Sequence, residues 1–314
     1  MKRIGLMLLL LSQIVSAQGM DKITLALDWY INPDHAPILV AFSQGYFKQQ
    51  GLEVTLISPV QSTEPAQLVA AGQADLGIDY QPSVLVEMAA GMPLIWVGTL
   101  VNQPLNCIVV LANSPIHRLA DLKGRSIGYS ASPSTVAMLN SMLSFNHIAP
   151  NSVNQISIQM DLSQALLSHR VDAVDGMMRN VEPIQLQNMG YATRLFFPEE
   201  NGVPSYDELV IIANKNTVNR SEVARFNKAL AEGVAYLQAH PNLSWTQVSA
   251  NYKADLAPNA QMAAANKAIW LNSIQYFDAN PARLDAMRYQ KFEGFMLREG
   301  VLKQAIPIDA YKGG

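Results

Sequence analysis

Residues 27–37 carry the stretch Leu27-Asp28-Trp29-Tyr30-Ile31-Asn32-Pro33-Asp34-His35-Ala36-Pro37. An apolar run before it, Ile23–Leu27, predicts a strand, and an apolar helical pattern after it runs from His35 towards a glycine at Gly51. The loop between the two is polar and aromatic. Open α/β sheets bind small molecules at the carboxyl ends of their strands, so this loop predicts a ligand site.

Short β-like runs alternate with helical runs along most of the chain, which is typical of an α/β fold with mainly parallel sheets. The predicted strands are Ile23–Leu27, Val54–Ser58, Leu76–Tyr80, Leu94–Thr99, Ile108–Leu111, Ser126–Tyr129, Ile156–Gln159, Ala173–Gly176, Thr193–Phe197 and Glu208–Ala213. Helices that end at a glycine stop signal are predicted over His35–Gln49, Pro65–Ala71 and Pro82–Ala90. From Ser221 to Leu302 the pattern is mostly helical.

The length of 314 residues exceeds the usual size of one domain and predicts two lobes. We expect a signal peptide at 1–17, a discontinuous first lobe formed by 18–107 and 208–314, and a second lobe at 108–207. A faint internal repeat supports two similarly built lobes, because Leu68–Asp75 resembles Ala165–Asp172. Chance similarity between short α/β units is the alternative explanation.

Residues 1–17 have the pattern of a cleaved secretory signal, with two basic residues, an apolar run and a small-residue cleavage site; a buried N-terminal helix is the alternative. Cleavage after Ala17 leaves 20 basic and 25 acidic residues, a net charge of −5 that gives no reason to expect nucleic acid or anionic lipid as a partner. No later stretch approaches the roughly 20 apolar residues of a membrane helix. We therefore expect a soluble, monomeric protein in the periplasm.

The single cysteine, Cys107, excludes an internal disulfide and a thiolate metal cluster. It lies beside the strand-like run Ile108–Leu111, where a buried, inert thiol is a better interpretation than a nucleophile.

Several motifs, in a consistent order and spacing, resemble the thiamine-pyrimidine precursor binding family within the sulfonate- and nitrate-type periplasmic binding proteins. The motifs are Asp28-Trp29-Tyr30 to His35, Leu68–Asp75, Tyr80–Leu85, Gln103–Asn106, Asp121–Arg125 before Gly128-Tyr129, Arg170–Ala173 and Gly202–Val210. The resemblance implies a two-lobed, type II periplasmic-binding-protein fold that closes over a small molecule and delivers it to an ABC transporter permease. It implies a thiamine pyrimidine precursor as ligand, no cofactor and no catalysis.

Three aromatic residues, Trp29, Tyr80 and Tyr206, end or adjoin strand-like runs, so each is a candidate to face a cleft between the lobes. A flat aromatic ligand would gain about 0.5–1.5 kcal/mol per stacked ring beyond the burial of its area. Ordinary core packing is the alternative for each of them.

Glu182 is the leading polar candidate, because a carboxylate can accept from the amine of an aminopyrimidine and from a protonated ring nitrogen, a contact of about 1.5–3 kcal/mol. A solvated glutamate at a helix start is the alternative. The other polar candidates are Asp28, Asn32, His35, Asn106, Ser130, Ser132, Asn180 and Glu208. For Asn32 and His35 the alternative is an asparagine turn and a helix start, and for the serines it is capping of a helix.

The chain departs from the family pattern at Met178 and Val181, where an aromatic residue and a histidine are expected, so another vitamin-like heterocycle could also fit. The rival functions are a pyrimidine synthase, a sensory binding module and a sulfonate-binding protein. The fungal synthases share the Asn32-to-His35 motif but rely on a cysteine-rich iron motif, which Cys107 alone cannot supply. A sulfonate would favour a cleft rich in serine and arginine.

Overall fold

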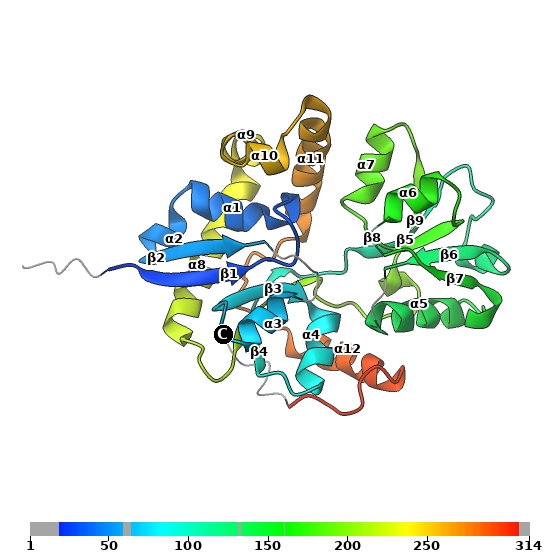
Figure 1. Ribbon diagram of the computed structural model, residues 1–314, viewed down its shortest axis with the longest axis horizontal. Coiled ribbons are helices and arrows are strands. Elements are labelled where there is room, and N and C mark those ends of the chain that lie inside the picture. The colour runs from blue at the N-terminus through cyan, green and yellow to red at the C-terminus, as the bar shows by residue number, and fades with distance from the viewer. Residues whose placement is uncertain (1–18, 59–63, 131–132, 160, 308–314) are drawn as a thin grey trace, which may run out of the picture.

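Two five-stranded sheets organise the chain, one in each of two lobes (Figure 1). The structure is a computed structural model that describes residues 19–58, 64–130, 133–159 and 161–307. In the first lobe the strand order is β2-β1-β3-β10-β4, and in the second lobe it is β7-β6-β8-β5-β9. The strands are β1 (Asp21–Ala26), β2 (Leu52–Ile57), β3 (Leu76–Tyr80), β4 (Leu94–Val101), β5 (Asn106–Leu111), β6 (Ser126–Tyr129), β7 (Asn154–Ser157), β8 (Ala173–Met178), β9 (Thr193–Phe196) and β10 (Leu209–Asn214).

Both sheets are mainly parallel, and each includes one antiparallel strand. In the first sheet β1 runs parallel to β2 and β3, while β10 runs antiparallel to β3 and β4. In the second sheet β6 runs parallel to β7 and β8, while β5 runs antiparallel to β8 and β9. The predicted α/β class and two-lobed architecture are confirmed. The lobe boundaries at residues 107 and 208 stay a prediction.

The internal repeat has a structural counterpart in the two lobes. Asp75 precedes β3 and accepts the Thr24 N–H through Oδ2 at 2.7 Å, while its own N–H donates to the Thr24 oxygen at 2.9 Å. Asp172 precedes β8 and does the same with Ser126, at 2.8 Å and 3.0 Å. The two aspartates therefore fix equivalent strand pairs, and the repeat reflects similarly built lobes.

Burial along the strands follows how fully their faces are covered. Strands β4, β5 and β10 are buried at every residue, as expected for apolar strands covered on both faces, even though β4 lies at the edge of its sheet. The other edge strands, β2, β7 and β9, carry exposed or half-buried residues. All ten predicted strands are present, and their ends differ from the prediction by at most two residues.

Helices α5 to α7 belong to the second lobe, and the other α-helices belong to the first (Figure 1). The α-helices are α1 (Ala36–Ser43), α2 (Tyr46–Gln49), α3 (Glu64–Ala70), α4 (Gln81–Ala89), α5 (Pro133–Phe145), α6 (Leu162–Leu167), α7 (Glu182–Asn188), α8 (Arg220–Ala239), α9 (Pro241–Asn251), α10 (Lys253–Leu256), α11 (Ala260–Ser273) and α12 (Ala286–Arg298). The 3-10 helices are η1 (Pro33–His35), η2 (Leu119–Leu122), η3 (Pro150–Ser152), η4 (Pro198–Glu200) and η5 (Ile274–Tyr276). The helical segment predicted after Ser221 is confirmed.

The single helix predicted over His35–Gln49 is wrong. The chain forms η1, α1 and α2 there, and Gly45 separates the two α-helices with a φ of 73°. This left-handed conformation ends α1 and favours glycine, which has no Cβ to clash.

The predicted signal peptide, residues 1–17, lies outside the described residues. Within the described ranges, no helix combines the length and the apolar character needed to cross a membrane.

Candidate functional site

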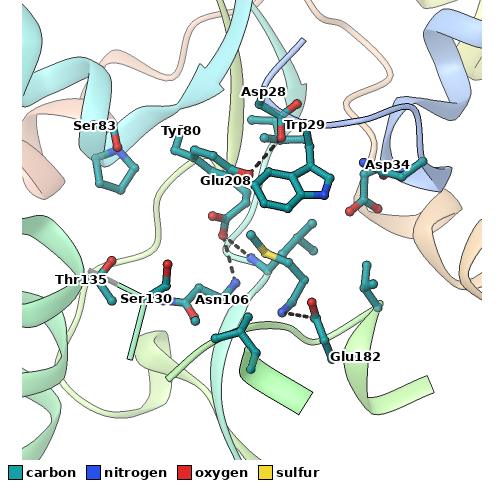
Figure 2. A pocket seen from close by; sticks show the side chains of 18 of the residues that line it. Asp28, Trp29, Asp34, Tyr80, Ser83, Asn106, Ser130, Thr135, Glu182 and Glu208 are labelled. Carbon is teal, nitrogen blue, oxygen red and sulfur yellow. Dashed lines mark hydrogen bonds between the residues drawn. The ribbon is translucent and has the colours of Figure 1, made fainter. Parts of the chain in front are cut away.

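A cavity of about 630 Å³ lies between the two lobes. Its walls come from the carboxyl ends of β1, β3, β6 and β8, from the amino ends of α4 to α7, and from the two connections that join the lobes. Figure 2 shows residues of both lobes pointing into this space, among them Trp29, Tyr80 and Glu182. The strand ends of both sheets therefore meet at one site, as open α/β sheets favour.

The cavity gathers most of the predicted site residues, although they come from distant parts of the chain. Nine line its wall: Asp28, Trp29, Asn32, Tyr80, Asn106, Ser130, Glu182, Tyr206 and Glu208. Met178 and Val181, the two departures from the family pattern, also line it. Of the other three, Ser132 lies outside the described residues, and His35 and Asn180 point elsewhere.

His35 does not line the cavity; it contacts Asp28, which does. Its side chain is fully buried, with Nδ1 accepting the Asn32 N–H at 3.3 Å and Nε2 lying 2.9 Å from Asp28 Oδ1. Since Nδ1 accepts, Nε2 carries the proton and donates to Asp28. The capping arrangement at the start of η1 turns the imidazole inwards, so the prediction of a direct ligand contact is corrected to a positioning role.

Asp28 in turn fixes an aromatic wall of the cavity. The Tyr80 hydroxyl donates to Asp28 Oδ2 at 3.0 Å, and burial, with the Asp28 charge as a second cause, holds the pKa of Tyr80 well above its usual value. Trp29 follows Asp28 directly and is half-buried, with its ring edge-to-face on Tyr30. Two rings, Trp29 and Tyr80, are therefore held at the cavity wall by one loop and one strand end.

Tyr206 contributes less to the cavity than predicted. Its ring is 1% exposed and packs on Phe292, with the ring centroids 4.8 Å apart. Tyr206 therefore belongs mainly to the core and offers no open face for stacking, which is the alternative that its sequence position allowed.

Asn180 joins the lobes and does not face the cavity. It is fully buried, and its Nδ2 donates to Asp34 Oδ1 at 2.6 Å and to Ser273 Oγ at 2.8 Å, while Ser273 donates to the same aspartate oxygen at 3.0 Å. Asn180 lies two residues after β8, where the chain returns towards the first lobe, and the preceding Arg179 N–H donates to the Leu105 oxygen. The predicted ligand contact is therefore corrected to a contact between lobes.

Glu182 and Asp34 bring two carboxyl groups to the cavity from opposite lobes (Figure 2). Glu182 begins α7 and accepts the Met178 N–H at 2.7 Å. Burial raises its pKa to about 7, and the charge of Asp34 adds to the rise. Burial likewise raises the pKa of Asp34 to about 6. Sequence reasoning missed Asp34, although it lies between the predicted residues Asn32 and His35.

Glu208 and Asn106 lie where the chain passes between the lobes. Glu208 Oε2 accepts the N–H groups of Leu105 and Asn106, at 2.6 Å and 3.0 Å, so one side chain ties the two connections together. Asn106 is 8% exposed, and its Oδ1 is buried without a hydrogen-bond partner. Cys107, next in the chain, is buried and bonds to the Met177 oxygen at 3.3 Å, as expected for an inert thiol.

The charged residues of the cavity are all acidic. The carboxylates at its wall are Asp28, Asp34, Asp79, Glu87, Asp161, Glu182 and Glu208, and the described lining residues include no lysine, arginine or histidine. Arg179, the basic residue near Glu182 in the sequence, does not line the cavity; it holds Glu199 through two bonds of 2.7 Å and 2.9 Å and stacks on Phe197. In the described ranges no three His, Cys, Asp or Glu side chains are placed to hold a metal ion.

Comparison with known proteins agrees with this architecture. The alkanesulfonate-binding protein SsuA of Xanthomonas axonopodis pv. citri, solved with MOPS bound, superposes with a TM-score of 0.71 at 16% identity, over 94% of this chain and 99% of that one. The chain therefore has the two-lobed periplasmic-binding-protein fold. The profile of the family described as NMT1/THI5 like matches residues 32–244, and the chain belongs to this family.

Curated relatives support the family at the level of sequence. A putative thiamine biosynthesis protein of Haemophilus influenzae is 40% identical over 291 residues, which cover 93% of this chain and 91% of the relative. A formylaminopyrimidine-binding protein of Halalkalibacterium halodurans is 33% identical over 72% of this chain and 69% of its own. A 4-amino-5-hydroxymethyl-2-methylpyrimidine phosphate synthase of Uromyces fabae is 27% identical over 72% of this chain and 70% of its own.

Proposed function

We propose that this protein is a periplasmic solute-binding protein of an ABC importer, and that it captures a planar nitrogen heterocycle between its two lobes. A thiamine pyrimidine precursor is the leading ligand. The observation that carries the proposal is the composition of the cavity wall, which combines aromatic rings with carboxylates and contains no basic residue among the described lining residues. The relatives named for formylaminopyrimidine binding and thiamine biosynthesis support the same ligand class.

An aminopyrimidine suits this wall chemically. Its ring can stack on Trp29, and its amine, together with a ring nitrogen when that nitrogen is protonated, can donate to Glu182 and Asp34, which approach from opposite lobes. A hydrogen bond to a charged group contributes about 1.5–3 kcal/mol, so both lobes would add to affinity when they close together. The predicted site residues that line the cavity, apart from the core residue Tyr206, are accordingly proposed as ligand contacts.

A sulfonate fits the wall poorly, although the structural neighbour from Xanthomonas is an alkanesulfonate-binding protein. Anionic ligands need convergent donors and are best held by a guanidinium. Here a sulfonate would face seven carboxyl groups, and Arg179 is already paired with Glu199. The similarity at 16% identity concerns the fold and not the ligand.

An enzyme is the second candidate function, because relatives such as the one from Uromyces fabae are named as synthases. We favour binding because the more similar relative, from Halalkalibacterium halodurans, is named as a binding protein. In addition, the single cysteine is buried, and its S–H donates a hydrogen bond to a backbone oxygen. Formation of 4-amino-5-hydroxymethyl-2-methylpyrimidine phosphate by the purified protein would favour the synthase.

Two measurements test the proposal. Native mass spectrometry of freshly purified protein should reveal a co-purifying heterocycle, and a thermal-shift panel should show stabilisation by aminopyrimidines. A ligand at 100 times its dissociation constant adds about 2.7 kcal/mol of stability. Stabilisation by taurine or another alkanesulfonate, with none from aminopyrimidines, would overturn the assignment.

The export step is tested separately. The signal pattern of residues 1–17 leads us to expect a mature, monomeric protein that starts near Gln18 in the periplasmic fraction. N-terminal sequencing and the native mass together check this, and an intact Met1 in the cytoplasmic fraction would contradict it.

A further inference from the structure

Two carboxyl groups, the buried Asp79 and the half-buried Glu87, line a part of the cavity to which the proposed function assigns no ligand group. Asp79 precedes Tyr80 on β3, and Glu87 comes from α4. In Figure 2, Ser83, which lies in the first turn of α4, is across the cavity from Glu182. Glu87 follows Ser83 by one helical turn, and both Asp79 and Glu87 line the cavity, so the pair forms a second acidic part of the site, separate from Glu182 and Asp34.

Each member of the pair has one carboxyl oxygen without a hydrogen-bond partner. Asp79 is 1% exposed; its Oδ1 accepts the Tyr80 N–H at 2.7 Å, and its Oδ2 has no hydrogen-bond partner. Glu87 Oε2 is also buried without a partner. A buried carboxylate oxygen left in this state is unfavourable, so the pair must hold a proton or meet a donor from outside the chain.

The surroundings offer no internal cation to meet this need. Asp28 and Tyr80 face the pair from the strand ends of the first lobe, and Asp161 and Glu208 line the same cavity. Burial, followed by the charge of Glu87, holds the pKa of Asp79 well above its usual value, and burial raises that of Glu87 to about 7. No lysine, arginine or histidine stands among the described residues of the wall.

We propose that Asp79 and Glu87 form a second subsite, which takes a positively charged substituent, such as a primary ammonium group, on the heterocyclic ligand. This subsite rests on the proposed function and adds to it that the ligand carries a positively charged substituent. The cavity of about 630 Å³ lies in the size range of pockets that hold ligands larger than one ring. The heterocyclic ring would lie against Trp29, and the ammonium group would donate to Asp79 Oδ2 and Glu87 Oε2.

Proton balance follows from this arrangement. Because the pKa values of both carboxyl groups are raised, the empty pair binds protons near neutral pH, and an entering ammonium group displaces them to solvent. A ligand whose substituent is neutral leaves those protons in place. The charged ligand should therefore release more protons per molecule bound than the neutral one, by up to about one.

Matched ligands test the subsite directly. One is 4-amino-5-hydroxymethyl-2-methylpyrimidine, and the other carries an aminomethyl group at the same position, so the pair differs in the charge of one substituent. At pH 7.5 we expect the aminomethyl compound to bind at least tenfold more tightly by isothermal titration calorimetry, which corresponds to about 1.4 kcal/mol. Titrations in buffers of different ionisation enthalpy should show the extra proton released.

Variants identify the residues responsible. Asp79→Asn and Glu87→Gln should each reduce the ratio of the two affinities to less than threefold, while the exposed Glu53→Gln, with the same change of charge, should keep it. Glu87 is only half-buried, so its variant carries the test if Asp79→Asn does not fold. Equal affinities in the wild type, or a ratio preserved in both variants, would overturn the subsite. Failure of both pyrimidines to bind would refute the proposed function instead.

Discussion

Replacing Glu182 by glutamine should stabilise the empty protein and weaken ligand binding. Burial raises the pKa of Glu182 from an ordinary 4.5 to about 7, so folding disfavours the ionised carboxylate. The stability that this group contributes is present below pH 4.5 and is lost as the pH rises through about 7. At about 1.4 kcal/mol per pKa unit the loss is roughly 3 kcal/mol, and the side chain's partial exposure to cavity water reduces it to about 1–2 kcal/mol.

Glutamine is a close mimic in shape, and its amide oxygen can still accept the Met178 N–H that Glu182 now accepts. Urea denaturation at pH 8 should therefore show Glu182→Gln to be more stable than wild type by about 1–2 kcal/mol, with a smaller difference at pH 5. Calorimetry with an aminopyrimidine should show an affinity about 10- to 100-fold weaker, because a charged hydrogen bond is lost.

The exposed Glu200→Gln in the same lobe serves as the control and should change neither quantity. A variant that is less stable than wild type at pH 8, or that binds within twofold of wild type, would refute the view that Glu182 is a strained binding carboxylate.

Three further variants test the surrounding contacts. Trp29→Ala should weaken binding about 10- to 100-fold through lost stacking and burial, whereas Trp29→Phe should keep most of the affinity in the same calorimetric assay. Equal affinities of the two variants would show that the Trp29 ring does not contact the ligand. His35→Ala should lower the free energy of unfolding by about 3 kcal/mol because Asp28 loses its buried donor, and His35→Gln, which keeps an N–H donor, should lose less in urea melts. Asn180→Asp places a second carboxyl group beside Asp34, whose pKa is about 6, so its loss of stability relative to Asn180→Ala should be large at pH 8 and shrink at pH 5. An unchanged difference between the two pH values would argue against that ion–ion contact.

The sequence predicted the strands because they depend on local pattern, and the candidate residues that it placed at strand ends line the cavity. Apolar runs such as β4 and β10 bury every residue, and the residues that follow strand ends, such as Trp29, reach the cavity. The orientation of individual side chains could not be predicted from the sequence in the same way. His35 turns inwards because of a capping arrangement, and Asn180 meets residues distant in the chain.

The sequence offered Asp28, Glu182 and Glu208 as acidic candidates, but the other carboxyl groups of the cavity wall were not predicted. Asp79 reads as one polar residue within a buried strand, and Glu87 reads as part of the solvated face of a helix. Only the assembly of β3 and α4 around the cavity brings both carboxyl groups to the wall. Arg179 lies near Glu182 in the sequence, but it pairs with Glu199 and does not line the cavity.

The central position of β10 sets the order in which the two lobes can be completed during synthesis. Every strand of the second sheet lies between Asn106 and Phe196, so that sheet can form from one continuous segment of the growing chain. In the first sheet β4 pairs with β10, which begins only at Leu209, after the entire second lobe has been made. Such distant pairings form slowly because a long loop must close first. The lobe that contains the N-terminal strand β1 is thus the last to be completed.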